Sequence, residues 1–190
     1  SAASDVYKRQ LQEYAEKCLV AEITRQKVDL PAVNDRAGLA TYFKFHSSDY
    51  RWEHPRYKGV VLHCVDKKTA KQAKKLLKKV PEKEWEDILR KTFNTSGDEK
   101  IKIEQGIFAD GDNKYIDKLV FKKGGFESVM SYPFTIVAGK KQKGPDDYRE
   151  VIEQVRKDYR NYLNAYWERE LEESGKVEIN QEVLKTVNNN

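Results

Sequence analysis

The sequence lacks the long apolar runs and the short motifs that would assign it to a class at once. No stretch approaches the ~18 consecutive apolar residues of a membrane span, and no apolar run with a small-residue cleavage site opens the chain. The motifs GxSxG, HExxH, GxxxxGK[ST] and paired CxxC are also absent. The most common sequence signals for hydrolysis, nucleotide binding and structural zinc are therefore missing.

Cysteine, proline and glycine are scarce. Two Cys, five Pro and ten Gly in 190 residues rule out a disulfide scaffold and collagen-like or low-complexity sequence. Charged residues make up 35% of the chain with a net charge of +5, and aromatic residues make up 11%. This aromatic content argues against disorder, so we expect a globular protein with a heavily charged surface. Cys18 and Cys64 could form a disulfide only if the first helix lies against the central sheet, which the sequence leaves open.

The first ten residues resemble an artefact. SAASDVYKRQ can be encoded by a string similar to a transposon adapter used in sequencing libraries. We therefore exclude residues 1–10 from the fold prediction and interpret the chain as the C-terminal part of a longer protein.

Both ends of the remaining chain show helical periodicity. Apolar residues recur at three- and four-residue steps over residues 11–28, and we expect Leu30 and Pro31 to end that helix. Asn34 or Asp35 can cap a second helix. A long aromatic stripe predicts a helix over residues 146–173, followed by a brief extended piece at 177–180. The stripe is interpreted as core packing or, alternatively, as a half-exposed cleft for extended peptide.

The centre of the chain mixes strands and helices. Strands are predicted at residues 60–65, 101–108 and 132–138, the last at a sheet edge or strand start because of Pro133. Between them we expect a helix over 67–79 capped by Asp66, and another starting at Pro81. GDN at 111–113 and the pair Gly124 and Gly125 predict turns. The fold class is therefore α+β.

His63 and Cys64 are the only adjacent pair with metal-binding or nucleophilic character. Neighbouring side chains on a strand point to opposite faces, so the two cannot easily converge on one ion. We expect a structural role for both and predict no metal site.

Seven lysines without an intervening acid line the helix predicted at 67–79. A basic nucleic-acid-binding domain is therefore one alternative hypothesis. No aromatic residue is interleaved to stack bases, and acids crowd the next helix, so a solvated helix face is the better prediction and no nucleic acid is expected.

At residues 59–138, the order strand, Lys-rich helix, second helix, strand, turn, strand and edge strand resembles a parvulin (PpiC-type) peptidyl-prolyl isomerase domain. Residues 106–125, GIFADGDNKYIDKLVFKKGG, are similar to the family's G-W-F … F-x-x-A-x-F-x-L-K-x-G, with Phe121 at the last aromatic. The lead-in GLATYFKFHSSDYRW resembles the segment that precedes such domains. The tail, from DYREVIEQVRKDYRNYLNAYWEREL to VEINQEVL, is similar to the C-terminal helix and closing strand of SurA-type periplasmic folding factors.

The resemblance implies a degenerate parvulin-like domain at residues 57–140. A helical chaperone segment at 11–56 would precede it, and a C-terminal helix with a closing strand at 145–187 would return to that segment. It further implies a periplasmic protein-folding factor that needs no cofactor and has no membrane span. Its partners would be unfolded polypeptides, including those bound for the outer membrane. The residues it suggests for peptide contact are Phe108, Ile116, Phe121, Phe126, Tyr132 and Phe134, although core packing is the better prediction for Phe121.

The chain departs from the family at the catalytic positions. The family's two histidines align near Val60 or Val61 and near Thr135, and its pocket Met and Phe align near Asp112 and Ile116. A prolyl isomerase must hold the amide while it twists over a barrier of ~18–20 kcal/mol. We therefore expect binding of unfolded chain with little isomerisation. The alternative is an active isomerase in which His63, Cys64 or Asp112 supplies the polar group.

Overall fold

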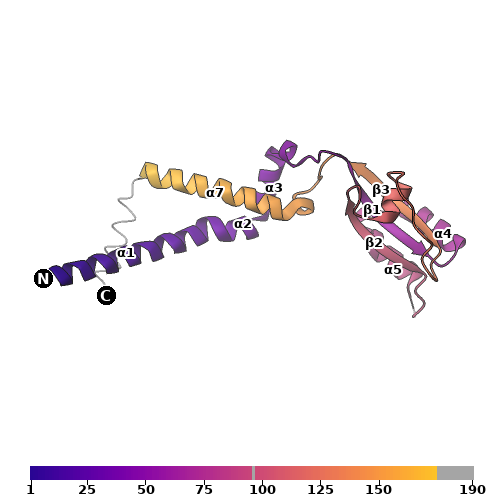
Figure 1. Cartoon of the computed structure of the whole chain (residues 1–190), viewed down its shortest axis with the longest axis horizontal. Coiled ribbons are helices and arrows are strands. Elements are labelled where there is room, and N and C mark those ends of the chain that lie inside the picture. Colours follow the sequence, from indigo (N-terminus) through magenta and orange to yellow (C-terminus); the bar gives the residue numbers. More distant parts are fainter. Residues whose placement is uncertain (96, 175–190) are drawn as a thin grey trace. The chain divides into compact units, whose positions relative to one another are not determined.

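The computed structural model describes residues 1–95 and 97–174 and divides the chain into two compact units (Figure 1). The first, the helical unit, contains Ser1–Tyr50 and the described chain from Pro145 onward. The second, the sheet unit, is Arg51–Gly144 and is inserted between the two parts of the first. The extended piece expected at 177–180 lies outside the described residues.

The sheet unit is built on a three-stranded antiparallel sheet. The strands are β1 (Arg56–Cys64), β2 (Ile101–Phe108) and β3 (Phe134–Gln142), in the order β2–β1–β3. The prediction of an α+β fold with a small antiparallel sheet is confirmed, and so is the edge position of the strand that follows Pro133.

Each face of the sheet carries its own apolar cluster. Alternate residues of β1 point to opposite faces, so Val60, Leu62 and Cys64 pack under helices α4 (Lys67–Leu77) and α5 (Trp85–Phe93). On the other face Tyr57 and Val61 pack with Ile116 of the short helix α6 (Lys114–Leu119). The central strand is therefore buried on both sides.

Two glycines let β1 and β3 approach closely. Gly59 and Gly139 are cross-strand partners. A Cβ on Gly59 would lie 2.1 Å from the Ala138 carbonyl oxygen, and a Cβ on Gly139 would lie 2.2 Å from the Lys58 carbonyl oxygen. The backbone of Gly139 has φ +153°, which also favours glycine.

Capping residues set the helix starts of the sheet unit. The Asp66 side chain accepts a hydrogen bond from the Thr69 N–H, as predicted, and this bond lowers the pKa of Asp66. Pro81 precedes a single 3-10 turn, η3 (Glu82–Glu84), which leads into α5. The turn predicted at the GDN segment is confirmed, and its Asn113 also caps α6, because the side-chain oxygen accepts from the Tyr115 and Ile116 N–H groups.

The prediction that Leu30 and Pro31 end the first helix is wrong. The helix α1 (Ala2–Thr24) continues through a π-helical turn, η1 (Arg25–Asp29), into α2 (Leu30–Asn34). Pro31 is at the first turn of α2, where a missing N–H is tolerated because the wider π turn has already shifted the hydrogen-bond register. Residues 2–10 form the first turns of α1, and α1 buries no residue.

The rest of the helical unit packs around an apolar cluster and contains two tyrosine–aspartate hydrogen bonds; the cluster consists of Leu39, Phe43, Tyr50, Val155 and Tyr159. Helix α3 (Arg36–Phe45) is capped by Asp35 and leads into η2 (Ser47–Tyr50), while η4 (Tyr148–Val151) leads into α7 (Ile152–Ser174). The Tyr159 hydroxyl donates to Asp35 at 2.7 Å, and the Tyr50 hydroxyl donates to Asp158 at 2.7 Å. These bonds connect α7 to both ends of the segment that contains α3.

No helix in the described part of the chain is both long enough and apolar enough to cross a membrane.

Candidate functional site

His63 lies near the end of the central strand β1, and both of its ring nitrogens are engaged. The residue is 5% exposed. Its Nδ1 is 2.9 Å from Oγ1 of Thr135, the cross-strand partner on β3, and its Nε2 is 2.7 Å from Oε2 of Glu104 on β2. One side chain from each strand therefore meets at this point.

These contacts use the whole hydrogen-bonding capacity of the imidazole. An ionised carboxylate only accepts, so Nε2 carries the proton that faces Glu104. In the neutral ring Nδ1 is then the acceptor, and the Thr135 hydroxyl donates to it. Both ring nitrogens of His63 are therefore engaged by side chains of the sheet and neither is directed at a ligand.

The network continues from Glu104 to helix α6. The Asn113 side-chain amide donates to Glu104 Oε1 at 3.2 Å while its oxygen caps the helix. The Tyr115 ring meets the His63 ring edge-on, with centroids 4.5 Å apart and an interplanar angle of 70°. Glu104, Asn113 and Tyr115 were not among the predicted site residues. The sequence shows that Glu104 lies inside a predicted strand, but its pairing with His63 depends on the register between strands, which the sequence does not give.

The structure does not bring the three catalytic candidates together. Cys64 is fully buried in the cluster on the opposite face from His63, and burial raises the pKa of its thiol to about 11. Asp112 is exposed, and its Oδ2 accepts from the Ala109 N–H at 2.8 Å within a turn. Cys18 and Cys64 are both free cysteines.

Three of the residues predicted for peptide contact belong to the apolar cluster under α6. Ile116 is 0% exposed, and Phe108 and Phe121 pack against it partly buried. For Phe121 this agrees with the expected core packing. Ile116 cannot touch a ligand without movement of α6, so its role is to support the residues around it.

Two others, Phe126 and Phe134, lie together in a cavity of about 460 Å³ beside β3. We call this cavity the edge groove. Phe134 is 41% exposed, and the ring of Phe126 meets that of Tyr115 at 4.8 Å. The lining residues of the edge groove are Lys67, Ala70, Lys71, Lys74, Phe126, Pro133, Phe134, Thr135 and Ile136.

Tyr132, the sixth predicted contact, lies near the groove without lining it. Its hydroxyl donates to the Glu99 carbonyl oxygen at 2.9 Å, and the Lys102 ammonium lies 5.2 Å from its ring centroid. These contacts hold the segment that leads into β3.

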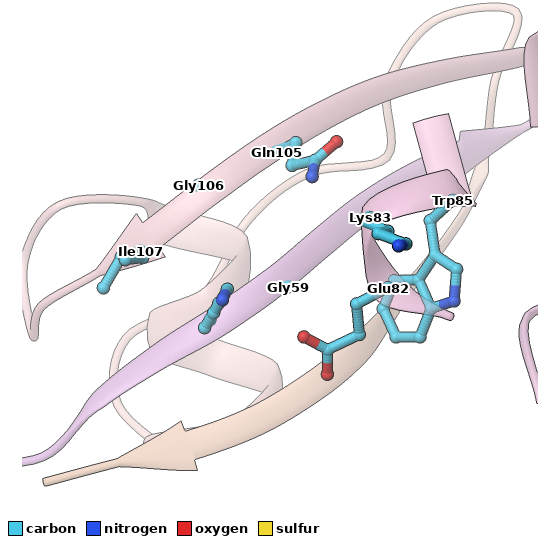
Figure 2. A pocket seen from close by; sticks show the side chains of 8 residues that line it. Gly59, Glu82, Lys83, Trp85, Gln105, Gly106 and Ile107 are labelled. Atoms are coloured by element: carbon cyan, nitrogen blue, oxygen red, sulfur yellow. The ribbon is translucent and has the colours of Figure 1, made fainter. Parts of the chain in front are cut away.

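A second cavity lies on the α5 face of the sheet (Figure 2). It measures about 240 Å³ and is bounded by Glu82, Lys83 and Trp85 of the helical segment and by Gln105 and Ile107 of β2. The indole N–H of Trp85 donates to the Val80 carbonyl oxygen at 2.9 Å, so the ring is fixed as a wall of the cavity. This volume is below the ~300–1,000 Å³ of ordinary ligand sites, so the cavity does not define a site for a polypeptide.

The helical unit has an aromatic groove of its own. A cavity of about 580 Å³ lies between α3 and α7 and is lined by Asp35, Tyr42, Phe45, Tyr159 and Tyr162, among others. Phe45 is 80% exposed and Tyr162 is 51% exposed, whereas Tyr159 is buried. The aromatic stripe of α7 is thus core along one side and open along the other.

Among residues 1–95 and 97–174, no three His, Cys, Asp or Glu side chains gather where they could hold a metal ion. Comparison of the chain with protein-family models, with curated proteins and with solved structures gave no match.

Proposed function

We propose that this chain is part of a protein-folding factor of the peptidyl-prolyl isomerase family, that it binds extended polypeptide, and that it isomerises proline little or not at all. The observation that carries the proposal is the edge groove. Phe126 and Phe134, both suggested by the parvulin resemblance, line one cavity beside a strand at the edge of the sheet. An edge strand with adjacent apolar pockets is a common way to bind an extended peptide, because main-chain hydrogen bonds and side-chain pockets act together.

The order of elements supports the family part of the proposal. In the sheet unit a strand is followed by two helices, a second strand, a short helix and a third strand that pairs with the first. The resemblance rests on the same order as far as the turn after β2, but it expects a further strand before the edge strand, where the structure has α6. The SurA-like tail then suggests a periplasmic location and unfolded, outer-membrane-bound clients.

The state of His63 supports the second part, the low isomerase activity. A buried imidazole bonded to Thr135 and Glu104 is a structural cross-link between strands. Thr135 is near the position where the family has its second histidine. In place of the family's two histidines, this chain has a hydrogen bond between Thr135 and His63.

The aromatic groove between α3 and α7 supplies a second apolar surface of the kind that grips unfolded chain. Tyrosine suits such a surface because its ring is apolar and its hydroxyl tolerates water.

Two assays on the full chain test the proposal. In the first, the chain should slow the aggregation of a chemically unfolded client protein, and the substitution Phe134→Ser should weaken that effect. The matched control is Met130→Ser, which changes another exposed apolar side chain that does not line the groove. Equal aggregation with and without the chain would contradict the proposed binding.

In the second assay the chain is added to a short X–Pro peptide whose cis–trans exchange is followed directly. We expect the exchange to stay near its uncatalysed time of tens to hundreds of seconds. Turnover comparable with that of a complete parvulin domain, lost in His63→Ala, would establish the active isomerase instead.

A further inference from the structure

The edge groove has a charged wall as well as an apolar one. Helix α4 contributes Lys67, Lys71 and Lys74, which share one helix face at steps of four and three residues. The apolar wall is formed by Phe126, Pro133 and Phe134. Lysine stems can lie along such a cavity while their ammonium groups remain at its rim.

These three lysines carry uncompensated charge. None forms an ion pair within the described part of the chain, although other lysines there, such as Lys91 with Asp87, do. No acidic residue lines the groove. A ligand with negative charge would therefore meet complementary groups, whereas a cationic one would be repelled.

The shape of the groove favours an extended chain. Phe134 and Ile136 pair in register with Cys64 and Leu62, so they point to the α4 face, while Thr135 pairs with His63 and points to the opposite face. All three line the groove, which therefore wraps around the edge of β3. A strand laid along this edge would place alternate side chains on the two faces.

We propose that the edge groove selects extended polypeptide segments in which acidic residues alternate with apolar ones. The acidic side chains would lie beside the lysines of α4, and the apolar side chains between them would lie against Phe126 on the other face. Alternate residues of a strand are about 6.8 Å apart, close to the ~6 Å rise over the four residues from Lys67 to Lys71. This selectivity rests on the proposed function, since it names the class of segment that the same groove takes.

The test uses the full chain and two fluorescent nine-residue peptides. In the first peptide Glu alternates with Val, and in the second Gln replaces every Glu. The variant K67Q/K71Q/K74Q removes the groove lysines. The variant K68Q/K75Q/K78Q removes the same charge from exposed positions of α4 and its C-cap that do not line the groove. Glutamine keeps good helix propensity in both variants.

We expect the Glu peptide to bind the unmodified chain about tenfold more tightly than the Gln peptide, as three modest surface ion pairs together predict. The groove variant should lose about this factor and the control variant at most about twofold. The preference for Glu should also shrink as salt is raised.

Three results would overturn the proposal. The first is equal binding of both peptides, and it leaves the proposed peptide-binding function intact. The second is equal loss in both variants, which would indicate the general field of α4 rather than the groove. The third is displacement of the fluorescent Glu peptide by single-stranded DNA at a far lower concentration than by unlabelled Glu peptide, if both triple variants also weaken the binding of this DNA. That result would favour a nucleic-acid-binding helix. Absence of binding to either peptide would instead count against the proposed function itself.

Discussion

His63 is a buried polar residue on the central strand β1, and its contacts indicate a structural role and not a catalytic one. Thr135 and Glu104 occupy both of its ring nitrogens, and Tyr115 covers its edge. Removing the ring leaves a space in the sheet and takes one hydrogen-bond partner from each of the half-buried residues Thr135 and Glu104. A buried polar group that loses its partner costs about 1–3 kcal/mol.

The substitution His63→Ala should therefore lower the free energy of unfolding by about 1–3 kcal/mol without changing any proline-isomerisation rate. The measurement is urea unfolding of the full chain. His54→Ala is the control, because His54 is exposed, and it should change stability by less than about 0.5 kcal/mol. An unchanged stability in His63→Ala would mean that the network does not hold the strands.

At the same scale, the sequence predicted the orientation of Cys64 but not the partner of His63. The alternation of β1 correctly predicts that Cys64 points away from His63. Glu104 could not be identified as the partner of His63, because it lies 41 residues further along the chain and only the register of β1 with β2 brings it near. Asp112 is a turn residue whose carboxylate is engaged by Ala109.

At the scale of elements, the pairing of β1 with β3 depends on two glycines that face each other. A side chain at Gly139 would meet the Lys58 carbonyl oxygen in an unfavourable backbone conformation. The clash involves backbone atoms, so it cannot be relieved by rotating a side chain.

Gly139→Ala should destabilise the sheet unit by about 2 kcal/mol or more, since backbone strain alone costs about 1–3 kcal/mol. Gly125→Ala is the matched control: nothing lies within 4 Å of its added Cβ, so it should be neutral or slightly stabilising. Denaturant unfolding of both variants measures the difference. Equal stability of the two would contradict the observed register.

Another element-scale prediction concerns the contact of α7 with Asp35. Burial first, and then the hydrogen bond to Asp35, raises the pKa of Tyr159 to about 12. Above the ordinary tyrosine pKa of ~10 the unfolded chain releases this proton while the folded chain keeps it. Stability from Tyr159 is therefore complete below pH ~10 and decreases as the pH rises from there toward 12.

We expect Tyr159→Phe to show a weaker decrease of stability at alkaline pH than the unmodified chain, and to be less stable at neutral pH by about 1 kcal/mol because the bond to Asp35 is lost. Urea unfolding over a series of pH values measures both effects. Tyr14→Phe, at an exposed position of α1, is the control and should leave the stability at neutral pH unchanged. The same slope in Tyr159→Phe and the unmodified chain would assign the alkaline decrease to other groups.

Local signals predicted many elements, and non-local contacts explain the misses. Asp66 correctly marked a helix start, and Asp35, one of the two caps predicted for another helix, begins α3. Pro133 predicted an edge position or a strand start, and β3 both follows it and lies at the sheet edge. The strand after Pro133 was expected to stop at Ala138 but runs to Gln142, because Gly139 can pair with Gly59 and the strand continues beyond it. The edge groove could be predicted only in part, since Phe126 and Phe134 were expected to contact peptide but the lysines of α4 were assigned to solvent.

At the scale of the whole molecule, the chain combines two units with different surfaces. The sheet unit carries the edge groove with its lysines, and the helical unit carries the aromatic groove between α3 and α7. If both bind the same unfolded client, the second contact is made at high effective concentration and strengthens the first. The proposed binding without turnover would suit a factor that holds a client chain until it folds.

The most direct test is an NMR titration of the isotope-labelled full chain with an unlabelled extended peptide that contains one X–Pro bond. We predict that the largest amide shifts fall at Phe126, Phe134 and Thr135, while the cis and trans signals of the peptide show no accelerated exchange. Shifts confined to residues outside the edge groove, or exchange catalysed by the chain, would contradict the proposal that this sheet binds polypeptide without isomerising it.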